Sequence, residues 1–454
     1  MMVPRTSLLV WTGFIAVPAA GWLVWAPGIM PAFLLLLWAG GATYDAWQSR
    51  LVLQDLHVTA PHTFRLARCR EERMFMRLTC VTQWPCLIRL GLTPAPELGL
   101  RETVQSVDVA SGQSDIRVEW RLIPRERGRY RIAQCHLETK SRWGFWSVRG
   151  VCPLDIGVFV YPGLLAQRHH VPALFMRRGL VGIRHQRRFG KGREFEQLRD
   201  YQSGDSLEDI HWKATAKRGY PVTKMYQVER TQEVYVAIDA SRLSGRPVAA
   251  GETAAIPDGH DSRRPDPLIE RYVNAALLLG RAAEIQGDRF GILTFSDRLL
   301  TFVRARRGQG HYRACLDAVC RLRTDAVTPD FSEVCTFIRQ HLRRRSLIVL
   351  LTQLDDPALA ETFLRDVEII RRQHVVLVCM PVPSIVQPLF DHPEAVRKPA
   401  DIYAALGGHL RWRQLRDVAD ALRKKGVGFL LTADDEMVVG LVAQYINIKQ
   451  RQLL

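Results

Sequence analysis

The amino-terminal part of the chain has the most apolar pattern. From residue 6 to residue 44 there is no charged side chain, a run of 39 residues. One membrane crossing by a helix needs about 20 apolar residues, so this run is long enough for two. Alanine, proline and glycine at 26–28 favour a turn in its middle. The pattern therefore predicts a hairpin of two membrane-spanning helices, at residues 7–25 and 29–44.

The predicted hairpin also carries a topology. Trp22 and Trp25 stand where aromatic side chains anchor a helix at the membrane surface. A cleaved signal peptide and one long buried helix are the alternatives, but a signal peptide has an apolar core of only about 7 to 15 residues. Because a hairpin returns the chain to its starting side, the positive-inside rule places both ends in the cytoplasm. We expect an inner-membrane protein whose soluble domains face the cytoplasm.

Residues 53–162 have the period-two pattern of β-strands. Ile116, Val118, Trp120 and Leu122 alternate with charged residues, as in a strand with one buried face. Similar short runs are separated by clusters of proline, glycine and serine. This region is expected to form a β-sandwich-like domain or a small barrel.

After residue 231, apolar strands alternate with amphipathic helices. Such a pattern predicts a mostly parallel sheet covered by helices on both faces, a doubly wound α/β domain. A polar stretch at 245–265 follows the first strand and is expected to be a loop. The predicted fold class is multidomain α+β, divided into a hairpin at 1–48, a β-sandwich-like domain at 49–165, a basic linker and signature segment at 166–230, and the α/β domain at 231–454.

The net charge indicates the classes of binding partner, and the cysteine content indicates the redox compartment. Lysine and arginine number 63 against 46 acidic residues, a net charge of +17 that attracts anionic membranes, acidic proteins or nucleic acid. Eight of these cations lie between residues 168 and 193, where no acidic residue occurs. Recognisable nucleic-acid-binding modules are missing, so no specific nucleic acid is expected. Nine cysteines without a C-x-x-C pair indicate reduced thiols and a reducing compartment.

Oxygen-bearing side chains follow the first strand of the α/β domain, where doubly wound sheets bind ligands. Asp239, Ser241 and Ser244 resemble the first loop of the metal-ion-dependent adhesion site of von Willebrand factor A domains, which binds Mg²⁺. Leu243 replaces the second serine of that loop, and Gln353 replaces a later aspartate. Asp355, Asp356 or Ser244 could complete the site only after loop rearrangement, so we expect a degenerate site and no required cofactor.

A more specific resemblance lies upstream, from residue 192 to residue 241. The sequence GREF opens it at 192–195, and an Arg-x-Tyr-x-x-Gly-Asp core follows. These positions resemble the signature of the domain of unknown function 58 family, which implies a membrane anchor and a von Willebrand factor A-like domain. The expected partner-binding or signature residues are Arg199, Tyr201, Gly204, Asp205, Trp212, Lys213 and Arg218.

This resemblance implies a function in protein assembly. Family members accompany MoxR-type AAA+ ATPases, so the chain is expected to be a membrane-anchored adaptor for such an ATPase and a client protein. Phosphate-loop, zinc-protease and serine-hydrolase motifs are absent from the sequence, and no enzyme activity is expected. A cation-dependent adhesion-type binding module and a metal-assisted hydrolase are the alternatives. The sequence identifies neither the client nor the oligomeric state.

Overall fold

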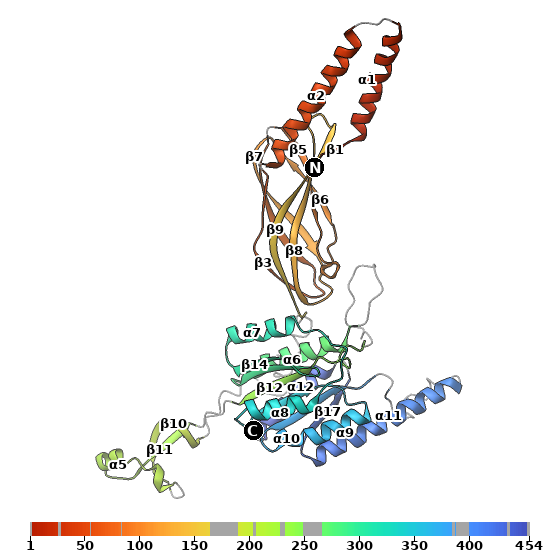
Figure 1. Cartoon of the computed structure of the whole chain (residues 1–454). Coiled ribbons are helices and arrows are strands. Elements are labelled where there is room, and N and C mark those ends of the chain that lie inside the picture. The colour runs from red at the N-terminus through yellow and green to blue at the C-terminus, as the bar shows by residue number, and fades with distance from the viewer. Residues whose placement is uncertain are drawn as a thin grey trace. The chain divides into compact units, whose positions relative to one another are not determined.

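The computed structural model describes most of the chain, in two compact units, Met1–Gly163 and Leu164–Leu454 (Figure 1). The described residues are 2–25, 29–54, 56–82, 84–163, 189–202, 206–227, 232–247, 266–383, 386, 399–433 and 436–451. The turn expected at 26–28, most of the basic stretch at 168–193 and most of the loop expected at 245–265 lie outside them.

The two helices predicted at the amino terminus are present as α1 (Thr6–Trp25) and α2 (Ile29–Gln54). The second helix is longer than predicted, because it continues past Tyr44 and through the expected domain boundary at 48. Within the described parts of the chain, no helix is long and apolar enough to cross a membrane, so the predicted double crossing is not supported.

Hydrogen bonds connect both helices to the turn at residues 143–146, between β8 and β9. The Trp146 indole Nε1 donates a hydrogen bond to the Ala42 carbonyl at 2.9 Å, and the Trp143 amide donates to Asp45 Oδ1 at 3.1 Å. The Ser7 hydroxyl donates to the Gly144 carbonyl at 2.6 Å. These contacts explain why α2 continues past Asp45, since this carboxylate is buried against the turn instead of ending the helix.

The rest of the first unit contains two β-sheets. One has the strand order β1-β9-β8-β5-β6, with β3 beside β9, and the other has the order β2-β4-β7. The strands are β1 (Met2–Pro4), β2 (His57–Thr59), β3 (Thr63–Ala67), β4 (Glu72–Thr82), β5 (Cys86–Leu92), β6 (Val104–Val109), β7 (Gly112–Leu122), β8 (Gly128–Lys140) and β9 (Trp146–Tyr161).

Side chains from both sheets form one apolar core, as in a sandwich. Trp120 and Leu122 on β7 are buried against Ile88 and Leu90 of β5 and Val158 of β9. The period-two pattern that predicted this strand is therefore confirmed.

The second unit begins with a small β-hairpin and ends with an α/β sheet. The hairpin contains β10 (Phe189–Asp200), a 3₁₀ turn η2 (Leu207–Asp209), α5 (Trp212–Arg218) and β11 (Val222–Gln227). The sheet contains β12 (Glu233–Asp239), β13 (Arg289–Phe295), β14 (Leu299–Arg306), β15 (Leu347–Leu351), β16 (Val375–Pro381) and β17 (Gly428–Thr432). Its order is β14-β13-β12-β15-β16-β17, and all of its pairs are parallel except β13 with β14.

Helices cover both faces of this sheet, as predicted for a doubly wound domain. The first face carries α6 (Leu268–Ile285), α7 (Gln309–Cys320) and α12 (Met437–Gln450). The second carries α8 (Phe331–His341), α9 (Pro357–Asp366), α10 (Glu368–Arg371) and α11 (Pro399–Lys424). Along β12, Val234 and Val236 contact the first layer and Tyr235 contacts the second.

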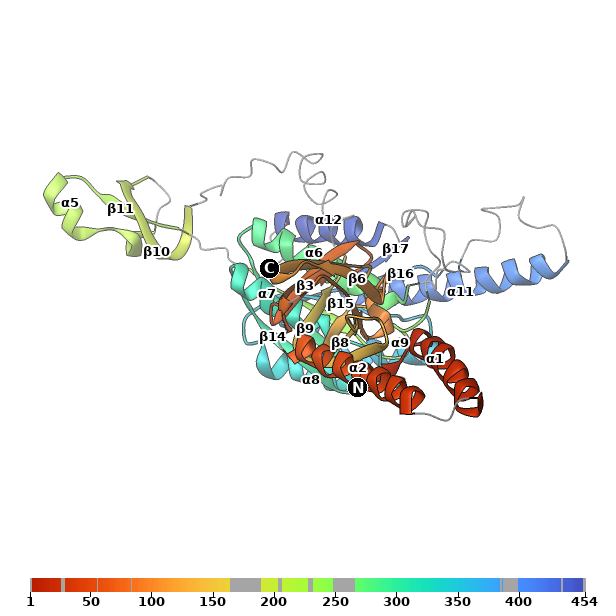
Figure 2. The same ribbon diagram turned by 90° about the horizontal axis from the view of Figure 1, so that it is seen from above.

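The last helix is bound to the start of the domain by a buried carboxylate. Asp288, just before β13, accepts a hydrogen bond from the Tyr445 hydroxyl and forms an ion pair with Lys449 Nζ at 2.7 Å. The Lys449 ammonium also donates to the Gln286 carbonyl at 3.1 Å. As a result α12 lies beside α6 (Figure 2), although their sequences are far apart.

Candidate functional site

Asp239 lies at the carboxyl end of the central strand β12, where doubly wound sheets bind ligands. Its side chain is fully buried. The Thr352 hydroxyl donates a hydrogen bond to Oδ2 at 2.6 Å, and the Ser241 amide donates to Oδ1 at 2.8 Å. Burial raises the pKa of the Asp239 carboxyl, while these hydrogen bonds act in the opposite direction. Oδ2 therefore links the end of β12 to the residue after β15, while Oδ1 fixes the loop that follows β12 itself.

The two serines of the predicted metal loop are buried as well. The Ser241 hydroxyl oxygen accepts a hydrogen bond from the Leu243 amide at 3.3 Å. Within the described residues the Ser244 hydroxyl has no hydrogen-bond partner. Leu243, which occupies the place of a serine ligand, is buried in the apolar interior. The loop thus presents one free hydroxyl instead of a complete ring of oxygen ligands.

Asp355, the fourth residue of the predicted metal site, pairs with an arginine. Its Oδ2 lies 2.5 Å from Arg246 Nη1, and the Arg246 side chain is 46% exposed. A guanidinium so close repels a cation. Across the described ranges, no group of three or more histidine, cysteine, aspartate or glutamate side chains could hold a metal ion. Asp239, Ser241, Ser244 and Asp355 as metal ligands stay a prediction.

Other polar residues at the same edge of the sheet were missed from the sequence. The Ser296 hydroxyl, directly after β13, is shared between Asp297 Oδ1 at 2.9 Å and Asp325 Oδ2 at 3.3 Å. The Asp325 amide donates to the Ala240 carbonyl at 2.8 Å, beside Asp239. Ser296 could have been found by applying the strand-end rule to the second strand. Asp325 could not, because no strand precedes it.

A shallow hollow of about 330 Å³ lies next to this cluster. It is lined by Arg242, Gly245, Arg246, Thr324, Asp325 and Ala326. Arg242 is exposed at this hollow, whereas Arg246 pairs with Asp355 and Asp325 adds a carboxylate, so Arg242 is the guanidinium group that the hollow offers to an acidic ligand.

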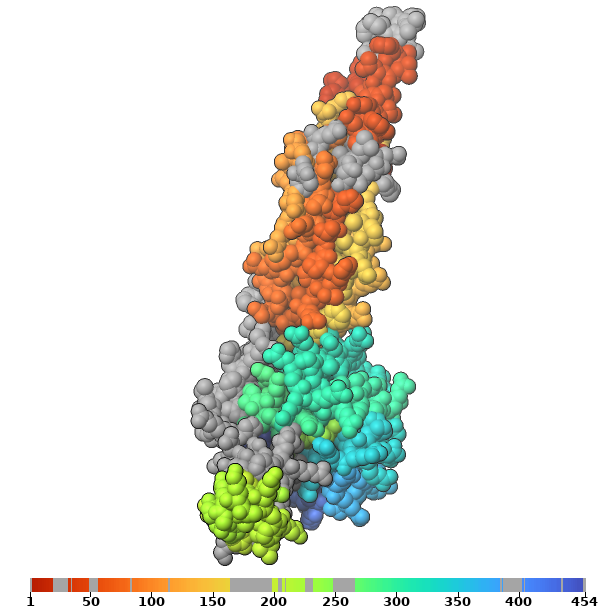
Figure 3. All heavy atoms as spheres, turned by 90° about the vertical axis from the view of Figure 1, so that its left-hand side faces the viewer, coloured from red at the N-terminus to blue at the C-terminus, as the bar shows by residue number. Residues whose placement is uncertain are grey.

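The signature segment, which includes α5 and β11, is coloured yellow-green in Figure 3. Gly204 and Asp205 of its core lie outside the described residues. Arg199 and Tyr201 lie at the end of β10 and are partly exposed. The Arg199 guanidinium donates to Gln202 Oε1 at 2.5 Å, and the Tyr201 amide donates to the Pro221 carbonyl at 3.0 Å.

Local hydrogen bonds fix the short helix α5 in this segment. His211 Nδ1 accepts the Ala214 amide at 3.0 Å and caps the amino end of the helix. Gly219, with φ of 78°, ends it in the left-handed conformation that suits glycine. The Thr215 hydroxyl accepts the Val222 amide at 3.1 Å and links α5 to β11.

Many of the described side chains of this segment are exposed to solvent. No residue of α5 is buried. Trp212 and Leu207 are each 70% exposed, and Tyr220 is 46% exposed. Lys213 and Arg218 are exposed on the same helix. The segment therefore presents apolar and basic side chains together, and we call Leu207, Trp212, Lys213, Arg218 and Tyr220 the α5 patch.

Residues 197–383 match the family described as protein of unknown function DUF58. The match covers the α5 patch and the edge of the sheet around Asp239. Uncharacterized protein Rv1480 of Mycobacterium tuberculosis and uncharacterized protein Mb1516 of Mycobacterium bovis are each 24% identical over 190 residues. These residues are 41% of this chain and 54% of the relatives, so the chain spans about half the length of the curated relatives that it matches.

Two solved structures are also similar. The VWA domain of SpRpn10 is 12% identical, covers 47% of this chain and 95% of its own, and has a TM-score of 0.28. The conserved hypothetical protein BatB from Bacteroides thetaiotaomicron is 11% identical, covers 48% of this chain and 99% of its own, and has a TM-score of 0.30. The doubly wound assignment of the α/β domain rests on its strand order and register.

Proposed function

We propose that this chain is a membrane-anchored adaptor that binds other proteins through the α5 patch. The observation that carries the proposal is the exposure of Trp212 and Leu207 on a segment that matches the DUF58 model. Exposed large apolar side chains gathered with cations are typical of protein-binding surfaces, in which tryptophan and arginine contribute most of the affinity. The partner is expected to offer an apolar pocket bordered by carboxylates.

The resemblance stated from the sequence supplies the class of partner. We assign the α5 patch to a MoxR-type AAA+ ATPase, with which proteins of this family are associated. The α/β domain would then contact the client protein, and the exposed Arg242 at the hollow supports an acidic client segment.

Membrane attachment is the second part of the proposal. Apolar side chains on α1 and α2 are exposed beyond what a soluble protein normally leaves uncovered. Leu9, Phe14, Val17, Leu36 and Leu37 are between 62% and 73% exposed. We propose that the two helices are embedded in the inner membrane, with the soluble units in the cytoplasm.

Binding is favoured over catalysis by the state of the reactive groups. Cys315 Sγ lies 3.6 Å from His311 Nε2, the spacing of a loose cysteine–histidine pair. Burial, however, raises the pKa of the Cys315 thiol to about 12, and the thiol therefore stays protonated. At the sheet edge, the Asp239 oxygens are already occupied by two donors.

The adaptor proposal is tested with the full chain in detergent and a purified MoxR-type ATPase from the source organism. Trp212→Ala combined with Leu207→Ala should weaken capture at least about 30-fold, because a central tryptophan at an interface contributes about 2 kcal/mol or more. Ile285→Ala, which removes a side chain 53% exposed at the end of α6, is the matched control. Unchanged capture by the folded double variant would exclude the α5 patch.

A cation-dependent binding module remains a second candidate function. The Ser244 hydroxyl, which has no hydrogen-bond partner among the described residues, favours it. The Arg246 guanidinium and the buried Leu243 oppose it. Magnesium titration of the full chain separates the two candidates.

A further inference from the structure

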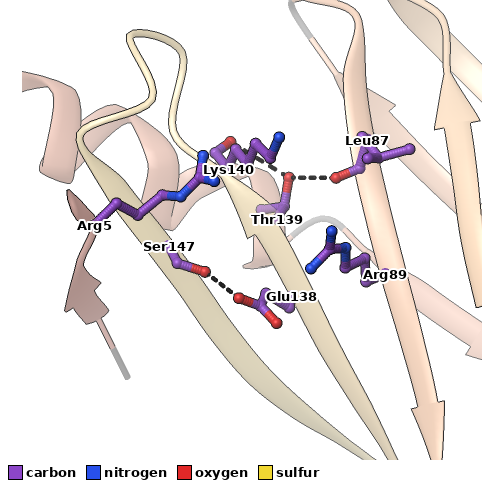
Figure 4. Close-up of a pocket in the computed structure, with 7 residues that line it drawn as sticks. All are labelled: Arg5, Leu87, Arg89, Glu138, Thr139, Lys140 and Ser147. Atoms are coloured by element: carbon purple, nitrogen blue, oxygen red, sulfur yellow. Dashed lines mark hydrogen bonds between the residues drawn. The ribbon is translucent and has the colours of Figure 1, made fainter. Parts of the chain in front are cut away.

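A small basic pocket lies where α1 leaves the β-domain. Figure 4 shows it on the outer face of β5, β8 and β9, with the Arg5 side chain reaching toward Lys140 and Arg89 lying beside Glu138. It is lined by Arg5, Leu87, Arg89, Glu138, Thr139, Lys140 and Ser147. Its free space is about 30 Å³, enough for about two water-sized groups. It can therefore admit the charged oxygens of a small group, but not an extended ligand.

The strand register explains why these side chains converge. Arg89 is opposite Glu138 on β8, and Glu138 is opposite Arg149 on β9. Lys140 is opposite Ser147, which pairs with Val3 of β1. The alternate residues Ile88 and Val148 point into the core, so the polar side chains share the outer face.

The pocket has an excess of positive charge. Its one carboxylate, Glu138, accepts a hydrogen bond from the Ser147 hydroxyl and lies 3.5 Å from Arg149 Nη2. The hydrogen bond from Ser147 and the charges of Arg149 and, to a smaller extent, Arg89 lower the pKa of Glu138, so this carboxylate is ionised. Arg5, Arg89 and Lys140 remain as cations, and Arg89 and Lys140 are exposed.

The surroundings of the pocket change character in the order found at a membrane surface. Exposed apolar side chains of α1 and α2 come first, including Leu9 and Phe14. Exposed aromatic side chains follow near the base of α2, where Tyr44 contacts Trp47 and Trp143 at ring distances of 6.3 and 6.4 Å. The basic pocket comes next. Apolar core, aromatic belt and basic residues succeed one another in the same way in membrane proteins.

We propose that this pocket binds the phosphate of an anionic phospholipid headgroup. The inference rests on the proposed membrane attachment of α1 and α2, and it adds a defined lipid contact to it. Guanidinium groups of Arg5 and Arg89 donate paired hydrogen bonds to phosphate oxygens, while Lys140 adds a point charge. Because Arg5 directly precedes α1, a phosphate held here lies at the level where the apolar helix begins.

The test uses the full chain in neutral-detergent micelles and calorimetric titration. The probes are dihexanoyl-phosphatidylglycerol, dihexanoyl-phosphatidylcholine and inorganic phosphate. We expect the anionic lipid to bind more tightly than both others. Each basic residue near anionic lipid contributes about fivefold in affinity, so the triple variant Arg5→Gln, Arg89→Gln, Lys140→Gln should lose about 100-fold.

Two further variants make the test specific. Arg65→Gln removes an exposed cation from β3. Arg65 is opposite Phe159, about 40 Å along β9 from the pocket, so this variant should bind lipid like the unchanged chain. Glu138→Gln removes the carboxylate of the pocket and should strengthen lipid binding, because Arg149 and Arg89 then lose the negative charge beside them. The gain in Glu138→Gln cannot be produced by misfolding.

The outcomes test the phosphate site separately from the membrane attachment of α1 and α2. Equal binding of both lipids, or undiminished binding by the triple variant, would overturn the phosphate site. Inorganic phosphate binding as tightly as the anionic lipid would overturn its assignment to a lipid. Flotation of the full chain with phosphatidylcholine vesicles tests the anchor alone. Failure to float would contradict membrane attachment, whereas the calorimetry would still decide whether the pocket binds phosphate.

Discussion

The sheet edge around Asp239 and the α5 patch place their signature residues in opposite environments. At the sheet edge Asp239, Ser241 and Ser244 are fully buried, whereas in the α5 patch Trp212 is 70% exposed. Buried motif residues stabilise the fold through hydrogen bonds, and exposed ones remain available to a partner. The difference supports the proposal that, in the matched region, a partner binds the α5 patch, whereas the Asp239 cluster stabilises the fold.

The largest effect is expected from removing the carboxylate at the sheet edge. Asp239→Ala should lower the free energy of unfolding of the α/β domain by about 3 kcal/mol, because the Ser241 amide and the Thr352 hydroxyl lose their buried acceptor. Calorimetric melting of the full chain measures this change. Asp420→Ala, on exposed α11, is the control and should stay within about 0.5 kcal/mol. An unchanged free energy of unfolding in Asp239→Ala would contradict the structural role of the sheet edge.

The raised pKa of Asp239 predicts a smaller, pH-dependent effect. The folded chain retains this proton at pH values where the unfolded chain has lost it, so the stabilising contribution is complete below about pH 3.9. The contribution is lost as the pH rises through the raised pKa. The melting temperature of the unchanged chain, relative to that of Asp239→Asn, should therefore increase as the pH falls from 7 toward 4. Parallel pH profiles would show that Asp239 titrates normally.

Magnesium should change the α/β domain very little. Millimolar Mg²⁺ should shift its melting temperature by less than about 1 °C relative to chelator, since a native-state ligand stabilises only if it binds. The Arg246 guanidinium, paired with Asp355, opposes a cation at this edge. A large saturable increase, abolished in Ser244→Ala, would instead establish a cation site and favour the adhesion-type module.

The smallest effect on stability is expected at the α5 patch. Trp212→Ala, Lys213→Ala and Arg218→Ala should each leave the melting free energy within about 0.5 kcal/mol, because their side chains are exposed. The same substitutions should weaken capture of the ATPase. A strongly destabilised Trp212→Ala would mean that the tryptophan is covered in the native protein, and the patch would then be a seam of the fold.

Local patterns predicted most of the architecture. The period of the apolar residues identified the β7 strand and the helices on both faces of the α/β sheet, and the length of the uncharged run at 6–44 identified the pair α1 and α2. The length of α2 was not predictable, because Asp45 looks like a helix end until its contact with Trp143 is known. A contact between residues 98 positions apart leaves no periodic signal in the sequence.

The candidate site was predictable only in part. The strand-end rule placed Asp239, Ser241 and Ser244 correctly at the edge of the sheet. It did not show that the Thr352 hydroxyl donates a hydrogen bond to Asp239. Nor did it show that Arg246 pairs with Asp355, 109 residues away in the sequence. The exposure of Trp212 was equally hidden, because a tryptophan is as compatible with a core as with a surface.

The attachment of α12 to α6 has a consequence for biosynthesis. Asp288 and the apolar face of α6 lie in the first third of the α/β domain, yet their partners Tyr445 and Lys449 are translated near its end. The domain therefore completes this part of its core only after α12 has been translated. A chain that ends before residue 437 would lack the helix that packs beside α6, and we expect it to be prone to aggregation.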